Sequence, residues 1–167
     1  MNIDHFLSIL VFSPLIGILL LLLIPRQKEH TLKFVGVLGT LPALVLAFLA
    51  FFQYRKGFDL GKLSENVGWI AFKSPVALGN LPKDLFTIDY ELGVDGLSLV
   101  LVLLTAVIAT LAAIASIHIK KEWKGYFILF LILEIGMLGV FTAENMILFF
   151  LFFEVTLIPT FFLIGKW

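Results

Sequence analysis

Five long apolar runs constrain the fold of this 167-residue chain more than any other feature. They cover residues 6–24, 32–54, 96–118, 126–141 and 146–164. A helix needs about 20 apolar residues to cross the hydrocarbon layer, and most of these runs approach that length. The chain is also 60% hydrophobic, whereas about 45–50% is usual for soluble domains. The sequence therefore predicts an all-α membrane protein with five transmembrane helices in a single membrane domain, 1–167.

A long extramembrane loop, residues 55–95, separates the second run from the third. Residues 86–91 alternate between apolar and polar side chains, which is typical of a strand, and residues 67–72 are their expected partner in a small hairpin. Asp95 directly precedes the third run and Ser98 follows three residues later, a pattern that predicts a helix N-cap.

Composition excludes several kinds of chemistry. The chain has no cysteine, which rules out disulfides, iron–sulfur ligation and thiol catalysis within it. Its net charge is zero and it has no basic run, so a nucleic-acid partner is not expected. No residue spacing indicates a metal site, a phosphate-binding loop or an activated nucleophile.

The distribution of basic residues predicts the orientation of the chain in a membrane. The leader before the first run has no Lys or Arg and no cleavage site follows the run, so we interpret this run as a retained span. Seven basic residues fall on one side of the predicted topology, in short loops or at the ends of the runs. They are Arg26, Lys28, Lys33, Lys120, Lys121, Lys124 and Lys166. The positive-inside rule then places the N-terminus outside.

Two acids lie within apolar runs that contain no Lys or Arg. Glu134 is in the fourth run and Glu154 is in the fifth. A carboxylate in the centre of a membrane helix costs about 2.5–3.5 kcal/mol on insertion scales, and such acids usually mark an ion or proton pathway. Desolvation disfavours the charged form, so each acid is expected to hold a proton until a cation approaches or water enters. For Glu154 the alternative is a neutral acid that is bonded to a backbone carbonyl.

The two acids are expected at the same depth. The fourth and fifth runs are joined by the short turn 142–145, and Glu134 and Glu154 lie ten residues before and after Glu144. At a rise of about 1.5 Å per residue, each acid is about 15 Å from the turn, near the middle of a hydrocarbon layer of about 30 Å. Spacing alone leaves open whether they share one cavity.

Pro159 and Thr156 are candidate supporting residues for Glu154. Pro159 has no N–H, so the carbonyl of Val155 loses its helical partner and is free to hold water, and the hydroxyl of Thr156 would hydrate the same region. Gly136 and Gly139 would let another helix approach near Glu134. The alternative is that Pro159 is a simple kink and that the glycines serve helix packing.

Three motifs resemble subunit M, or chain 4, of NADH-quinone oxidoreductase, the respiratory complex I. They are YELGVDGLSLVLVLLT at 90–105, ILEIGMLGVF at 132–141 and FFEVTLIPTFFLIGKW at 152–167. The resemblance implies the N-terminal portion of an antiporter-like subunit, as a fragment, a truncated frame or one piece of a split subunit. It also implies that Glu154 is a proton-pathway acid, with weaker support for Glu134. In that family the acid pairs with a lysine on a later helix, which this chain lacks.

The resemblance predicts a membrane subunit of a proton-pumping NADH:quinone oxidoreductase in the bacterial inner membrane. The chain itself would carry out no redox chemistry, because flavin, iron–sulfur clusters and quinone are expected in partner subunits. Its partners would be the other membrane subunits and the lipid bilayer. Two alternatives stay open: a subunit of an Mrp-type monovalent cation/proton antiporter, and a truncated structural piece without transport activity.

Overall fold

Five helical spans long and apolar enough to cross a membrane form the body of the molecule. The computed structural model describes residues 5–25, 27–57, 59–73, 84–119 and 122–167, and all five spans lie in this part of the chain. They are Phe6–Leu23, Glu29–Arg55, Gly96–His118, Trp123–Thr142 and Met146–Lys166, here called the first to fifth spans. This confirms the predicted all-α membrane fold.

The first two spans are each broken into two helices. The first consists of α1 (Phe6–Phe12) and α2 (Pro14–Leu23), and the second of α3 (Glu29–Leu38) and α4 (Leu41–Arg55). The third is α5 (Gly96–Ala115) with a short 3-10 turn η2 (Ser116–His118), the fourth is α6 (Trp123–Thr142) and the fifth is α7 (Met146–Lys166). As the sequence predicts, Asp95 caps α5, because its side chain accepts from the backbone N–H of Ser98 at 2.6 Å.

Both breaks lie where a proline removes a backbone donor. Pro14 has no N–H for the carbonyl of Leu10, and the hydroxyl of Ser13 donates to that carbonyl at 2.9 Å instead. In the second span, Pro42 follows the break and the hydroxyl of Thr40 donates to the carbonyl of Val37 at 2.9 Å. At the first break a side-chain hydroxyl thus replaces the missing backbone donor, and at the second the hydroxyl of Thr40 adds a bond to a carbonyl of the preceding turn.

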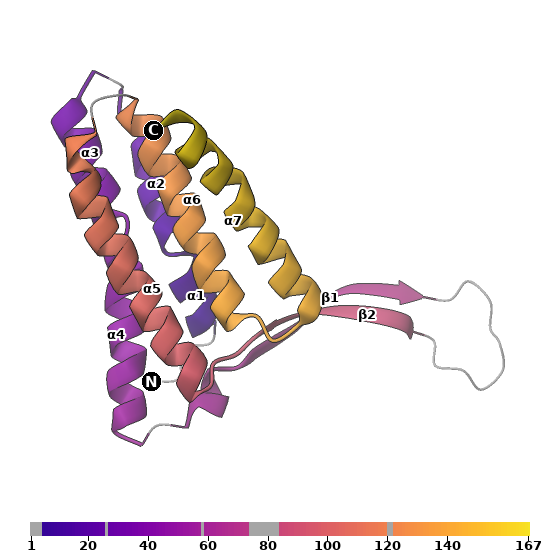
Figure 1. The fold of residues 1–167 in the computed structure, drawn as a ribbon. Helices are drawn as coiled ribbons and strands as arrows, with labels where there is room; N and C mark the ends of the chain where they lie inside the picture. The colour runs from indigo at the N-terminus through magenta and orange to yellow at the C-terminus, as the bar shows by residue number, and fades with distance from the viewer. Residues whose placement is uncertain (1–4, 26, 58, 74–83, 120–121) are drawn as a thin grey trace.

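Helix α6 is the centre of the bundle. It contacts α1, α2, α3, α5 and α7, and its side chains Phe127, Leu131 and Leu138 are fully buried. Helix α7 lies at one edge of the molecule and packs mainly on α6 (Figure 1). Most of the surface of α7 is therefore not covered by the described part of this chain.

The extramembrane segment between the second and third spans contains the predicted hairpin. Strand β1 (Glu65–Lys73) pairs antiparallel with β2 (Asp84–Leu92), with Val67 opposite Tyr90 and Ile70 opposite Ile88. The 3-10 turn η1 (Leu60–Leu63) precedes β1. The hairpin projects sideways from one end of the bundle (Figure 1). Residues 74–83, which include two prolines of the predicted loop, lie outside the described residues.

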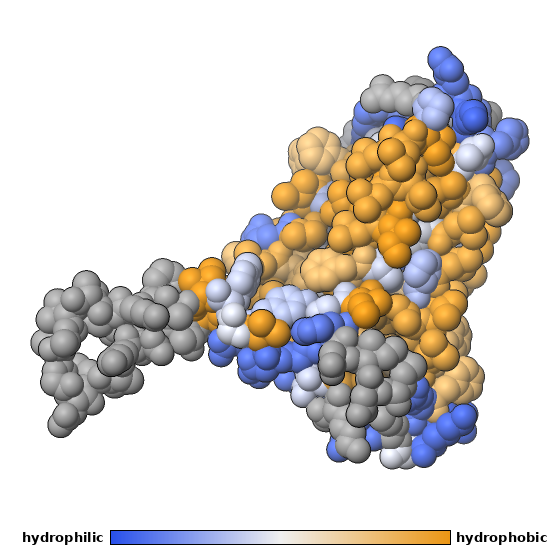
Figure 2. All heavy atoms as spheres, turned by 180° about the vertical axis from the view of Figure 1, so that it is seen from behind, coloured by the Kyte–Doolittle hydropathy of each residue, from blue (hydrophilic) through white to orange (hydrophobic). Residues whose placement is uncertain are grey.

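The hairpin base is joined to the turn between α6 and α7. The backbone N–H of Gly93 donates to the carbonyl of Thr142 at 2.8 Å, and that of Glu144 donates to the carbonyl of Glu91 at 3.0 Å. Figure 2 shows apolar side chains over the body of the bundle and polar side chains near its two ends. This distribution is the one expected of a membrane-spanning bundle.

Candidate functional site

Glu134 is a fully buried acid in the centre of the bundle. Its exposed fraction is 0%, and neither carboxyl oxygen has a hydrogen-bond partner among the described residues. Buried polar groups in proteins almost always have a partner, so an exception is informative. A buried carboxyl group without a hydrogen-bond partner in the described part of the chain is the feature that makes Glu134 a candidate for proton handling.

Contacts of its neighbours on α6 show which way Glu134 faces. A Cβ atom added to Gly36 would meet the ring of Phe127, and one added to Gly39 would lie 2.9 Å from Cδ1 of Leu131. Phe127, Leu131 and Glu134 are spaced by four and three residues, which places them on one face of a helix. A Cβ atom on Gly17 of the first span would also lie 3.0 Å from Cδ1 of Leu131, so Glu134 faces the first and second spans.

Glu154 lies on the outer side of α7. Its side chain is exposed in this structure. The face of α7 that packs on α6 carries Phe152 and Thr156, each two residues from Glu154. Two residues correspond to about 200° of rotation around a helix, so Glu154 points away from α6.

The seam between α6 and α7 separates the two acids. A Cβ atom on Gly136 would lie 2.6 Å from Cγ2 of Thr156, and one on Gly139 would meet the ring of Phe152. The glycines thus allow a second helix to approach closely, as the packing interpretation predicts. Glu134 is on the far side of this seam from Glu154, so the structure does not bring the two acids into one shared cavity.

The two candidate supporting residues, Thr156 and Pro159, lie on the side of α7 that forms this seam. Thr156 packs against Gly136, and its hydroxyl donates to the carbonyl of Phe153 at 2.6 Å. Pro159 is buried inside α7, which continues past it to Lys166. Thr156 and Pro159 therefore belong to the packed side of α7, not to the side that carries Glu154.

A polar cluster that the sequence analysis missed joins the hairpin to the first span. The carboxylate of Glu65 accepts from the backbone N–H groups of Leu7 and Ser8 at 2.6 and 3.0 Å, and from the hydroxyl of Ser8 at 2.5 Å. The hydroxyl groups of Ser8 and Tyr90 lie 2.9 Å apart. Burial raises the pKa of Tyr90, and the charge of Glu65 adds to this effect. Because Glu65 is 57 residues from Ser8, no local pattern indicates the contact.

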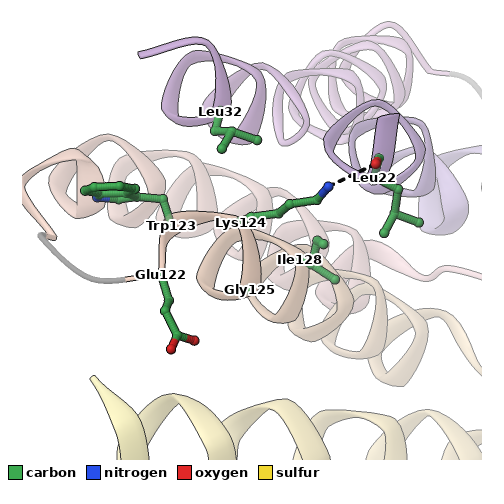
Figure 3. Close-up of a pocket in the computed structure, with 7 residues that line it drawn as sticks. All are labelled: Leu22, Leu32, Glu122, Trp123, Lys124, Gly125 and Ile128. Carbon is green, nitrogen blue, oxygen red and sulfur yellow. Dashed lines mark hydrogen bonds between the residues drawn. The ribbon is translucent and has the colours of Figure 1, made fainter. Parts of the chain in front are cut away.

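Basic side chains gather at the opposite end of the bundle. Lys124 donates to the carbonyls of Leu22 and Ile24, both at 2.9 Å, beside a cavity of about 400 Å³ (Figure 3). Lys33 lies over the ring of Trp123, and Lys166 pairs with Glu122. Arg26, Lys120 and Lys121 lie outside the described residues.

This arrangement indicates helix capping rather than catalysis at the basic end. Lys124 satisfies carbonyls at the C-terminal end of α2, where a positive charge is favourable. Within the described ranges, no group of three or more His, Asp or Glu side chains is placed to hold a metal ion.

Comparison with known proteins identifies a family of similar sequences. Residues 40–142 match the family described as NADH-ubiquinone oxidoreductase chain 4, amino terminus. NADH-quinone oxidoreductase subunit M of Rhodobacter capsulatus is 34% identical, over 98% of this chain and 30% of that protein. NADH-ubiquinone oxidoreductase chain 4 of Chondrus crispus is 31% identical, over 100% of this chain and 32% of that protein. The chain thus spans about a third of the length of these relatives.

A solved structure has the same fold. The match is to a chain in the structure of the membrane-bound sulfane sulfur reductase, an archaeal respiratory membrane complex. The TM-score is 0.69 over 97% of this chain and 23% of that chain, with 23% sequence identity. At that identity the likeness shows the arrangement of the helices and nothing about activity.

Proposed function

Because the chain belongs to the family of NADH-ubiquinone oxidoreductase chain 4, whose amino-terminal part it matches, we propose that it is a membrane subunit of a proton-pumping NADH:quinone oxidoreductase. In this proposal the chain conducts protons through membrane-embedded glutamates while quinone is reduced in other subunits. It is a translocase subunit with no redox chemistry of its own. Flavin, iron–sulfur clusters and quinone belong to its partners.

The observation that carries the proposal is the carboxyl group of Glu134. It is fully buried in the centre of a bundle that would span a membrane, and it has no partner among the described residues. An acid that stabilised the fold through an ion pair would have a basic neighbour. A protonatable group without one is suited to taking up and releasing a proton.

Glu154 is the second acid of the proposed pathway. It is as many residues from the turn between α6 and α7 as Glu134 is, but it faces outward from the edge helix α7. The relatives are about three times as long as this chain. We therefore assign the outer face of α7 to contact with later helices of a full-length subunit, where a basic partner would complete the site.

The proposed setting is the bacterial inner membrane, with the N-terminus outside and the other membrane subunits of the oxidoreductase as partners. Copurification tests this setting. A tagged full-length subunit is expected to bring down quinone-reducing activity. Recovery with a cation/proton antiporter and no redox activity would favour an Mrp-type antiporter subunit instead.

Replacement of Glu154 tests transport. We expect the E154Q variant of the full-length subunit to assemble normally and to lose proton pumping, because glutamine cannot exchange a proton. The matched control is E144Q in the exposed turn between α6 and α7, ten residues away. Pumping at the wild-type rate in E154Q would reject the role of Glu154. It would favour the structural alternative, in which this piece packs without moving protons.

A further inference from the structure

Two helix breaks and one buried acid lie within about one helical turn of a common level of the bundle. The break in the first span is at Ser13, and the break in the second span is at Gly39 and Thr40. Ser13 is 5% exposed, Thr40 is 0% exposed and Glu134 is 0% exposed. These three polar residues come from three different spans.

The packing of α6 on the first span places Ser13 near the level of Glu134. Lys124 contacts the carbonyls of Leu22 and Ile24, and Leu131 contacts Gly17, so α6 and the first span run antiparallel. Glu134 is one turn, about 4.5 Å, beyond Leu131. Ser13 is one turn before Gly17 on the same stripe of its span. The acid and the break in the first span therefore lie at about the same level on facing helices.

The second span gives the same result from the other direction. Phe127 lies on Gly36 and Leu131 lies on Gly39, so α6 and the second span run parallel. Thr40 is one turn beyond Gly36, on the stripe that faces α6. Thr40 follows Gly39, which Leu131 contacts, and Glu134 is one turn beyond Leu131, so the break in the second span lies within about one helical turn of the level of Glu134.

The breaks carry acceptor atoms that are suited to a water molecule. Ser13 and Thr40 each donate their hydroxyl proton to a backbone carbonyl, which leaves lone pairs on both oxygens. The carbonyl of Leu38 lies four residues before Pro42, which has no N–H to give it. A buried water molecule typically makes about three hydrogen bonds to groups of this kind.

We propose that Ser13, Thr40 and Glu134 form a buried hydration site in which at least one water molecule bridges the carboxyl group to the two helix breaks. The carboxyl O–H donates to the water. The water donates to the hydroxyl oxygens or to the carbonyl of Leu38. This site is separated from Glu154 by the seam between α6 and α7, and it does not depend on the proposed transport of protons.

Infrared spectroscopy of the full-length subunit in its complex tests the site. The carbonyl stretching band of protonated Glu134 is isolated by subtracting the spectrum of the E134Q variant. We expect this band at a hydrogen-bonded position, with a shift when H2O is replaced by D2O. T40V should move it toward the position of a free carboxyl group, because a hydroxyl oxygen is replaced by a methyl group of similar size.

The matched control is T142V, at the end of α6. Thr142 is also 0% exposed and its hydroxyl donates to the carbonyl of Leu138 at 3.0 Å, but it lies eight residues from Glu134. T142V should leave the Glu134 band unchanged. S13A is a second variant of the site, with the same expected shift, should T40V fail to assemble.

Two results would overturn the proposal. The first is a wild-type Glu134 band at the position of a carboxyl group without hydrogen bonds, insensitive to D2O and to both variants. It would show that no water is bound to Glu134. A carboxylate signal that depends on the sodium concentration would show a cation at the site instead of water. Proton pumping is not part of the infrared measurement, so rejecting the hydration site leaves the proposed function intact. In the same way, rejecting the proposed function leaves the hydration site intact.

Discussion

At the scale of single residues, the environment of an acid depends on which side of a helix it occupies. Glu134 and Glu154 are equally far from the turn that joins their helices, yet one is fully buried and the other is exposed. Glu65 shows a third situation, because its carboxylate is held by three donors at the start of the first span. A buried carboxyl group with its donors stabilises structure, and one without them is available for chemistry.

Truncation of Glu65 should loosen the hairpin from the first span. In E65A the backbone N–H groups of Leu7 and Ser8 lose their acceptor, which costs about 1–3 kcal/mol when the donors stay buried. We expect a lower midpoint of thermal unfolding for the full-length subunit and faster proteolysis in the hairpin. E91A is the control, because Glu91 makes one exposed hydrogen bond with Asn66 at 3.3 Å. Equal effects of the two variants would argue against this contact.

The same cluster predicts a loss of stability at high pH. Burial, followed by the charge of Glu65, raises the pKa of Tyr90 above its ordinary value of 10.0. The unfolded chain therefore releases this proton at a lower pH than the folded chain does. The contribution of protonated Tyr90 to the free energy of unfolding is complete below about pH 10. It decreases as the pH rises through the pKa of Tyr90 in the folded state. Thermal unfolding measured across this range should show a steeper decline for wild type than for Y90F, and parallel declines would contradict the assignment.

At the scale of helices, glycines allow close packing in two places: between the first and second spans, and between α6 and α7. Gly17 meets Gly39 where the first and second spans cross, and Gly136 and Gly139 receive α7. Small residues allow backbones to approach, and close packing is the main force between helices in a membrane. The direction in which each acid points follows from these contacts.

Substitution of Gly139 should disturb the seam between α6 and α7. A methyl group there would overlap the ring of Phe152, so we expect G139A to lower the free energy of unfolding by about 1–3 kcal/mol. G165A is the matched control on α7, because a Cβ atom at Gly165 has no heavy atom within 4 Å. Both changes raise helix propensity equally, so a difference in unfolding midpoint reports the seam. The same midpoint for both variants would contradict the packing described.

At the scale of the whole molecule, the sequence predicts the spans better than the site. Run length and polarity predict the five spans but not the breaks in the first two, and alternation predicts the hairpin. The equal distance of Glu134 and Glu154 from the turn, counted in residues, follows from the sequence. Their opposite directions do not, because these depend on which residues of α6 and α7 form the seam. The contact between Glu65 and Ser8 also cannot be predicted from the sequence, since it joins residues that only the folded chain brings together.

The central claim concerns the buried carboxyl group of Glu134, and proton pumping by the assembled complex tests it most directly. The E134Q variant is reconstituted in vesicles, and proton uptake and quinone reduction are measured in the same sample. We predict fewer protons moved per quinone reduced, with quinone reduction continuing, because glutamine fills the same space but cannot carry a proton. A ratio equal to that of wild type would contradict a role for Glu134 in proton transfer.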